Sequence, residues 1–177
     1  FSDGAAAIVL ASEDAAKKLT DKPVYIKGVG QASSGKLSSQ YRYLPRLRAR
    51  ELAAEQAYKM AGLTPRDIDV CELHDCFSIA ALIAAEGLGF FEYGTAGEAW
   101  ERGETRLGGK IPINMSGGLK SKGHPVAATG LSQAYELTRQ LRGQMVDQGR
   151  QVDGAKYALQ DTLGGDGVLV SIIYANQ

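Results

Sequence analysis

Two short segments of the chain carry side chains that could perform acid–base or nucleophilic chemistry. The first contains His74 and Cys76, which follow an apolar stretch and precede a helical pattern. In α/β folds, reactive groups commonly lie where a strand ends and a helix begins. A thiol near a helix start is expected to have a lowered pKa, because backbone N–H groups and the helix dipole stabilise the thiolate. The alternative is a buried, inert cysteine beside a hydrogen-bonded histidine.

The second segment surrounds His124, the other of the two histidines in the chain. Glycines at positions 117, 118 and 123 permit tight bends, and Pro125 fixes the backbone after the histidine on a turn before a helix. A histidine held in this way could take a proton from a thiol. The alternative is a glycine-rich surface turn with an incidental histidine. The segment lacks the GxGxxG and Walker patterns of phosphate-binding loops.

Composition excludes several classes of function. The chain has 177 residues, and its 20 basic and 20 acidic side chains give a formal net charge of zero, so we expect neither a nucleic-acid partner nor an anionic membrane surface. Cys71 and Cys76 cannot build a disulfide framework or a paired CxxC metal site, so we expect no metal and a reducing, cytoplasmic compartment. Cys71 is expected to be an inert core residue. The apolar runs are too short to predict a membrane span.

Alternating strand-like and helix-like patterns predict an α/β fold that positions these segments. The chain starts at Phe1 rather than at methionine, which suggests a processed or incomplete polypeptide. Residues 31–45 are expected to form a loop. The expected strands are 5–11, 24–29, 68–73, 155–160 and 168–174, and the expected helices are 49–61, 78–86 and 131–141.

The first expected helix is predicted from a stripe of apolar positions closed by Gly62, a residue type common at helix C-termini. This stripe consists of Ala49, Leu52, Ala53, Ala57, Met60 and Ala61.

An Asp-Gly pair precedes both the first and the last expected strand, at residues 3–4 and 166–167. The pair is frequent in turns, so chance explains it. A duplicated architecture also explains it, in which the chain begins at the last strand of one half and ends at the last strand of the next.

Together these segments resemble the thiolase superfamily, most closely its sterol-carrier-protein-X (SCP2) type. The resemblance is carried by His74-Asp75-Cys76-Phe77 (HDCF), by Gly123-His124-Pro125 followed by AATG, and by the opening Asp3-Gly4-Ala5. It extends over nearly the whole chain, in order and spacing. It implies a thiolase-like fold in which residues 1–20 end the N-terminal half. Residues 21–177 would form the C-terminal half, with a mixed five-stranded sheet covered by helices.

The resemblance also implies roles for individual residues. His124 would be the base that activates a nucleophilic cysteine. Cys76 would be the acid and base that moves a proton at the α-carbon of the acyl group. His74 would help to form an oxyanion hole for the thioester oxygen, since the developing enolate needs fixed donors.

The C-terminal glycine-rich turn departs from the family pattern. Many thiolases carry a Cys-x-Gly motif there, and Asp161 is assigned to the position of that cysteine. Backbone N–H groups around Leu163 and Gly164 would be candidates for the second oxyanion hole.

The implied activity is an acyl-CoA acyltransferase, which performs Claisen condensation or thiolytic cleavage of 3-ketoacyl-CoA in lipid metabolism. Coenzyme A thioester would be the substrate, with no tightly bound cofactor. The nucleophilic cysteine would come from an N-terminal thiolase half, on the same or another chain. Homo-oligomers, usually dimers, and a small zinc-and-OB-fold companion protein would be partners. The alternatives are a thiolase-like retro-aldolase and a non-catalytic structural subunit.

Overall fold

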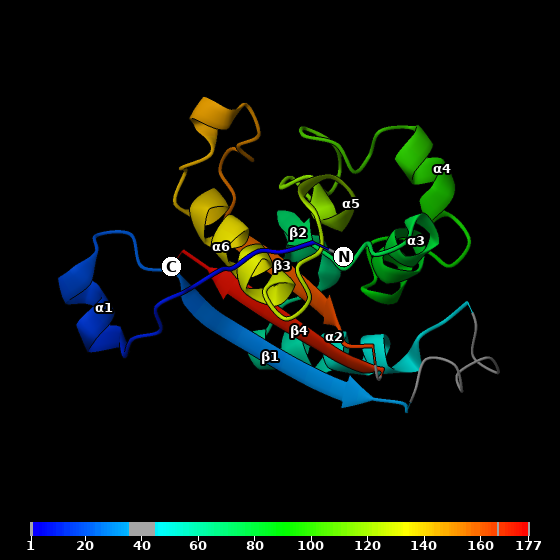
Figure 1. The fold of residues 1–177 in the computed structure, drawn as a ribbon, viewed down its shortest axis with the longest axis horizontal. Helices are drawn as coiled ribbons and strands as arrows, with labels where there is room; N and C mark the ends of the chain where they lie inside the picture. The colour runs from blue at the N-terminus through cyan, green and yellow to red at the C-terminus, as the bar shows by residue number, and fades with distance from the viewer. Residues whose placement is uncertain (1, 36–44, 166, 177) are drawn as a thin grey trace.

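The computed structural model describes residues 2–35, 45–165 and 167–176, and the strands of this part form one mixed four-stranded sheet (Figure 1). The order across the sheet is β1-β4-β3-β2. β4 is antiparallel to both of its neighbours, and β2 runs parallel to β3. The strands are β1 (Tyr25–Ser33), β2 (Val70–Glu72), β3 (Tyr157–Leu163) and β4 (Val168–Ala175).

Helices cover both faces of the sheet. α2 packs over β1 and β4, while α6 packs on the opposite face over β3 and β2 (Figure 1). None of the described helices has the length and apolar character that crossing a bilayer requires. The helices are α1 (Glu13–Leu19), α2 (Arg48–Ala61), α3 (Ser78–Gly87), α4 (Ala96–Glu101), α5 (Gly118–Lys122) and α6 (Thr129–Leu141), with short 3-10 turns at Pro65–Asp67 and Val146–Gln148.

α2 lies unusually close to β1 because the contact is made of small residues. A Cβ at Gly30 would lie 1.8 Å from the carbonyl oxygen of Ala53, and one at Gly28 would lie 2.2 Å from that of Ala57. Any side chain at these two positions of β1 would therefore collide with the helix backbone. The glycines thus determine how deeply α2 sits on the sheet.

The predicted apolar stripe of α2 is confirmed at its alanines and wrong at one end. Ala49, Ala53 and Ala57 are fully buried, whereas Met60 is 66% exposed. Gly62 ends the helix with a φ of 69°, in the left-handed conformation expected of a C-terminal glycine.

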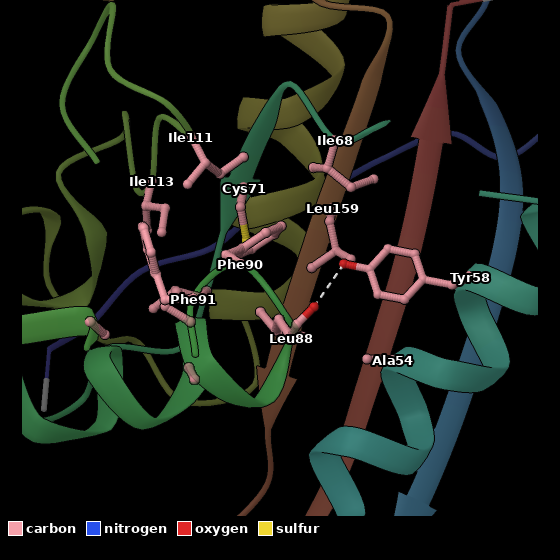
Figure 2. Packing of buried hydrophobic residues seen from close by; sticks show 14 of the residues in the cluster. Ala54, Tyr58, Ile68, Cys71, Leu88, Phe90, Phe91, Ile111, Ile113 and Leu159 are labelled. Atoms are coloured by element: carbon pink, nitrogen blue, oxygen red, sulfur yellow. Dashed lines mark hydrogen bonds between the residues drawn. The ribbon is translucent and has the colours of Figure 1, made fainter. Parts of the chain in front are cut away.

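The main apolar core lies between α2, the sheet and the segment around α3 and α4 (Figure 2). The hydroxyl of Tyr58 donates to the carbonyl oxygen of Leu88 at 3.0 Å, which ties α2 to the end of α3. Cys71 is fully buried in this core, and burial raises its pKa well above the usual value. The interpretation of Cys71 as an inert core residue is therefore confirmed.

The expectation of five strands was wrong, because the place beside β2 holds only a single bridge. Cys71 donates its N–H to the carbonyl of Pro112 (3.0 Å) and accepts from the N–H of Asn114 (2.8 Å). The pairing does not continue, because Pro112 has no N–H and Asn114 turns away with a φ of 56°. Residues 112–114 thus line the edge of the sheet without forming a strand.

The apolar run 5–11 was also predicted as a strand and is not one in the structure. Val9 is 88% exposed and Leu10 is 74% exposed, so this segment lacks the covering that its composition favours. It runs as extended chain past α6 toward α1 (Figure 1).

The remaining predicted elements are present with shifted ends. β1 continues to Ser33, which shortens the expected loop 31–45, and residues 36–44 of that loop lie outside the described part. β2 is limited to Val70–Glu72. The helix expected at 131–141 begins two residues earlier, at Thr129.

Candidate active site

A cavity of about 790 Å³ brings together five of the six residues singled out in the sequence. It lies where β2 and β3 end and α6 begins. The five are His74, Cys76, His124, Leu163 and Gly164, and the other lining residues are Ser2, Phe77, Leu119, Gly123, Val126, Ala127, Thr129, Gly130, Thr162 and Gly165.

The turn that carries His74 and Cys76 is fixed by neighbouring backbone. The N–H of Leu73 donates to Oδ1 of Asn114 at 2.7 Å. Oδ1 of the buried Asp75 accepts from the N–H of Leu119, also at 2.7 Å. The Asp75 carboxylate therefore joins the end of β2 to the glycine-rich segment that leads to His124.

Cys76 lies two residues before α3, at the helix start that the sequence predicted, but its pKa moves in the direction opposite to the one expected. Burial raises the pKa of the thiol, and this outweighs the backbone N–H groups of Phe77 and Cys76, which lower it. The Cys76 thiol is therefore protonated at neutral pH. In that state it can give a proton to a carbanion.

His124 is presented on a turn that only glycine can precede. Gly123 has a φ of 94° and a ψ of 167°, and a Cβ there would meet Oγ of Ser2 at 2.7 Å. Nδ1 of His124 lies 2.8 Å from Oγ1 of Thr129, and that hydroxyl donates to the carbonyl of Pro125. Because the hydroxyl has only one proton, Nδ1 must be the donor in the neutral ring. The lone pair is then on Nε2.

His74 is buried next to His124. The two ring centroids are 5.0 Å apart and the planes are nearly perpendicular, at 85°. Burial lowers the pKa of His74 to about 4, so the ring is neutral at neutral pH. Within the described residues its Nδ1 is buried and has no hydrogen-bond partner. A neutral imidazole carries one N–H that can donate to a developing negative charge.

The turn after β3 contributes less than the sequence suggested. Leu163 and Gly164 line the cavity, but the N–H of Gly164 donates to the carbonyl of Val168 at 2.8 Å. That N–H is committed to the turn and cannot also serve an oxyanion. Thr162, which sequence reasoning missed, lines the cavity one residue before Leu163.

Asp161 is the sixth predicted residue, and the structure places it outside the cavity. It is fully buried within β3, where its Oδ1 lies 2.9 Å from Nε of Arg50 in α2. The Asp161 side chain therefore does not line the cavity, whereas the neighbouring Thr162 does.

Gln133 of α6 joins the ends of the two strands that carry the site. Its Nε2 donates to the carbonyls of Glu72 (3.3 Å) and Asp161 (3.1 Å), and its Oε1 accepts from the Thr162 hydroxyl (2.9 Å). Sequence reasoning missed Gln133, because nothing in a helical pattern marks a buried glutamine as a bridge. Thr129 could have been found, since it lies one helical turn beyond the turn that presents His124.

The residues that the structure describes contain no group of three or more His, Cys, Asp or Glu side chains arranged to hold a metal ion. The groups of the cavity that can move protons are the two imidazoles and the Cys76 thiol.

Comparison with known proteins identifies the family. Residues 30–173 match the model described as thiolase C-terminal domain-like. Over 167 residues the chain is 50% identical to an acetyl-CoA acetyltransferase of Methanothermobacter thermautotrophicus, covering 94% of this chain and 43% of that protein. It is 44% identical to sterol carrier protein 2 of Gallus gallus, covering 98% of this chain and 32% of that protein.

A solved structure named "Ltp2-ChsH2(DUF35) aldolase" is similar with a TM-score of 0.77 and 26% identity, covering 88% of this chain and 40% of the other. The chain thus spans less than half the length of these relatives. The family model, the relatives and the fold agree, and the chain belongs to the thiolase family, in which it corresponds to the C-terminal domain-like region.

Proposed function

We propose that this chain supplies the acid–base part of a thiolase-type acyltransferase site, which cleaves 3-ketoacyl-CoA with coenzyme A or catalyses the reverse Claisen condensation. The observation that carries the proposal is that Cys76, His74 and His124 line one cavity, with the two rings 5.0 Å apart. The relative named acetyl-CoA acetyltransferase supports the same class of reaction.

The proposed cleavage begins at a nucleophilic cysteine, which we place on an N-terminal thiolase half in the same or another chain. Nε2 of His124 takes the proton of that thiol, and the thiolate attacks the 3-keto carbon. The bond between C2 and C3 breaks, and its electron pair forms the enolate of the departing acyl-CoA. The Cys76 thiol then gives its proton to C2. Free coenzyme A finally takes the acyl group from the nucleophilic cysteine, and the proton of the coenzyme A thiol and the proton held by His124 return to the two cysteines.

His74 is proposed to stabilise the enolate. Its neutral ring can direct an N–H at the thioester oxygen, where negative charge develops. Burial strengthens such a hydrogen bond, because little solvent screens it. For the second oxyanion, on the 3-keto oxygen, we propose the backbone N–H of Leu163, since that of Gly164 is already used.

The test uses the complete polypeptide or complex in which this chain is joined to its N-terminal half. CoA-dependent cleavage of 3-ketoacyl-CoA is measured in Cys76→Ala. We expect at least a ~10²-fold loss of kcat, because a proton-transferring group is removed. Cys71→Ala is the matched control and should retain turnover. Normal turnover in Cys76→Ala contradicts the proposal.

A retro-aldolase is the second candidate, because the similar solved structure is named an aldolase. Such an enzyme would cleave a β-hydroxyacyl-CoA without free coenzyme A as the acyl acceptor. Supplying this substrate in the absence of coenzyme A distinguishes the two reactions. A complete protein that turns over neither substrate would have a structural role.

The surroundings of the chain form part of the same proposal. We assign residues 1–20 to the end of the N-terminal half and residues 21–177 to the C-terminal half of a cytoplasmic homo-oligomer. A small zinc-and-OB-fold companion protein is a further proposed partner, supported by the similar solved structure, whose name includes a second component, ChsH2(DUF35). Light scattering on the complete protein measures the oligomeric state.

A further inference from the structure

A buried ion pair behind the cavity is not explained by stability. Arg50 of α2 and Asp161 of β3 are 1% and 0% exposed, and Nε lies 2.9 Å from Oδ1. Within the described residues, both Nη atoms of Arg50 and Oδ2 of Asp161 are buried without a hydrogen-bond partner. The hydroxyl of Ser171, which faces Asp161 across the β3–β4 pair, is in the same state. A buried ion pair with unpaired polar atoms contributes less to the free energy of unfolding than apolar side chains of similar volume would.

The pair lies directly behind the residues of the proposed site. β2 and β3 are parallel with Glu72 opposite Gln160, so Asp161 is level with the residue before His74. The side-chain amide of Gln133 spans the carbonyls of Glu72 and Asp161, which fixes the two strand ends side by side. The charges of the pair therefore have a fixed position relative to the HDCF turn.

The charges of the pair act on the titratable residues of the HDCF turn. After burial, which lowers the pKa of His74, the strongest influence on that ring is the Asp161 carboxylate, which raises the pKa more than Arg50 lowers it. For the Cys76 thiol the order is reversed. Burial and two backbone N–H groups come first, and Arg50 is then the strongest charged side chain and lowers the pKa.

We propose that Arg50 and Asp161 are positioning residues of the site, a buried ion pair held behind the HDCF turn by α2 and β3, whose opposite charges set the balance between thiol and thiolate at Cys76. The inference rests on the proposed function, in which Cys76 must release and recover a proton at the α-carbon. Burial alone would hold the thiol protonated, and a cation that cannot lose its proton offsets part of that effect.

The test measures the thiolate of Cys76 directly, without substrate. The complete polypeptide is alkylated with iodoacetamide across a range of pH, and modification at position 76 is quantified by peptide mass spectrometry. Arg50→Gln should move the midpoint to higher pH, and Asp161→Asn should move it to lower pH, because the remaining Arg50 cation is then uncompensated. Each change should alter the alkylation rate at fixed pH below the midpoint by at least ~3-fold, which corresponds to about half a pKa unit.

Shifts of the Cys76 alkylation midpoint in opposite directions distinguish an electrostatic effect from loosening of the fold. Loosening would expose the thiol and lower the midpoint in both variants. Arg50→Lys keeps the cation and should retain the wild-type midpoint. Arg102→Gln, which removes an exposed ion pair with Glu98 at the end of α4, is the control and should leave the midpoint unchanged. Unchanged midpoints, or shifts in the same direction, overturn the proposal.

If either single variant does not fold, the double variant Arg50→Gln/Asp161→Asn takes its place, because it leaves no buried charge unpaired. Its midpoint should rise, since the cation is lost, and an unchanged midpoint overturns the proposal. Because the alkylation measurement needs no turnover, its outcome is distinguishable from a failure of the thiolase proposal, which the activity assay detects. Conversely, if the midpoints shift as expected but the complete protein does not cleave 3-ketoacyl-CoA, the proposed reaction alone is rejected.

Discussion

The hydroxyl of Thr129 determines which nitrogen of His124 is protonated. Oγ1 of Thr129 lies 2.8 Å from Nδ1 of His124, and its own proton goes to the carbonyl of Pro125 at 3.1 Å. Thr129 is buried at the start of α6. The helix therefore fixes the tautomer of the proposed base.

Thr129→Val should impair catalysis more than it impairs stability. The isosteric methyl group removes the acceptor for Nδ1, so the ring is free to adopt the tautomer that lacks a lone pair on Nε2. We expect at least a ~10-fold loss of kcat, equivalent to about 1.4 kcal/mol of barrier, and a loss of about 1 kcal/mol in the free energy of unfolding. Steady-state kinetics and urea unfolding measure the two effects. Thr129→Ser keeps the hydroxyl and should remain close to wild type.

His74 should stay neutral well below the usual pKa of histidine. Its pKa is lowered to about 4 in the folded state, so the unfolded chain binds the additional proton between pH 6.5 and 4. The contribution of the neutral His74 ring to the free energy of unfolding is therefore fully present above pH 6.5 and is lost as pH falls toward 4. NMR titration of the ring, assigned with His124→Asn, should give a midpoint near 4. A midpoint near 6.5 would mean that the ring is solvated.

Glu72 should make the protein less stable as pH rises. It is buried at the end of β2, where its carboxyl group accepts from the N–H of Ser116 (3.0 Å) and lies 3.6 Å from Nζ of Lys122. Burial nevertheless raises its pKa to about 7. The folded state thus binds the additional proton between pH 4.5 and 7, and stability decreases across this window.

Glu72→Gln removes this pH dependence while keeping the shape of the side chain. Its free energy of unfolding should exceed that of wild type by about 1–3 kcal/mol at pH 8, and the difference should vanish near pH 4.5. Denaturant titrations at the two pH values measure it. A variant that is less stable at pH 8 would show that the Lys122 ion pair outweighs the cost of burial.

Gly30→Ala should strongly destabilise the packing of α2 on β1. The added Cβ would lie 1.8 Å from the carbonyl oxygen of Ala53, so the helix must move away. We expect a loss of about 3 kcal/mol or more, at the upper end of overpacking effects. Gly97→Ala in α4 is the control, because its Cβ would meet only Leu82 at 3.8 Å. That change should be neutral or stabilising by up to ~1 kcal/mol. Equal stability of both variants would contradict the close contact.

The sequence predicted the fold well where the apolar periodicity agrees with residues that end helices or form turns. Gly62 ends α2 as expected, and the two last expected strands are present and pair with each other. Prediction failed at the apolar run 5–11, because composition shows that a segment favours burial and does not show what covers it. It also predicted one strand too many in the sheet, since Pro112 and Asn114 limit the pairing beside β2 to a single bridge.

The sequence indicated which of the proposed site residues meet in one cavity, but it gave little sign of the residues that hold them in place. His74, Cys76 and His124 line one cavity, as their motifs indicate. The expected direction of the Cys76 pKa was wrong, because a local pattern shows a helix start but not the burial that opposes it. Asp161 was assigned by register to the substrate turn, and its buried partner Arg50 lies 111 positions away in the sequence. No local pattern connects the two.

The amide of Gln133 has a consequence for how this end of the molecule opens. Because it joins the carbonyls of Glu72 and Asp161 and is itself part of α6, it connects two strand ends and one helix, in addition to the β2–β3 ladder. Transient opening at one of the three is therefore coupled to opening at the others. Backbone amides around the three should therefore exchange with deuterium at a common rate, and the catalytic pocket should melt in one event rather than fray wall by wall.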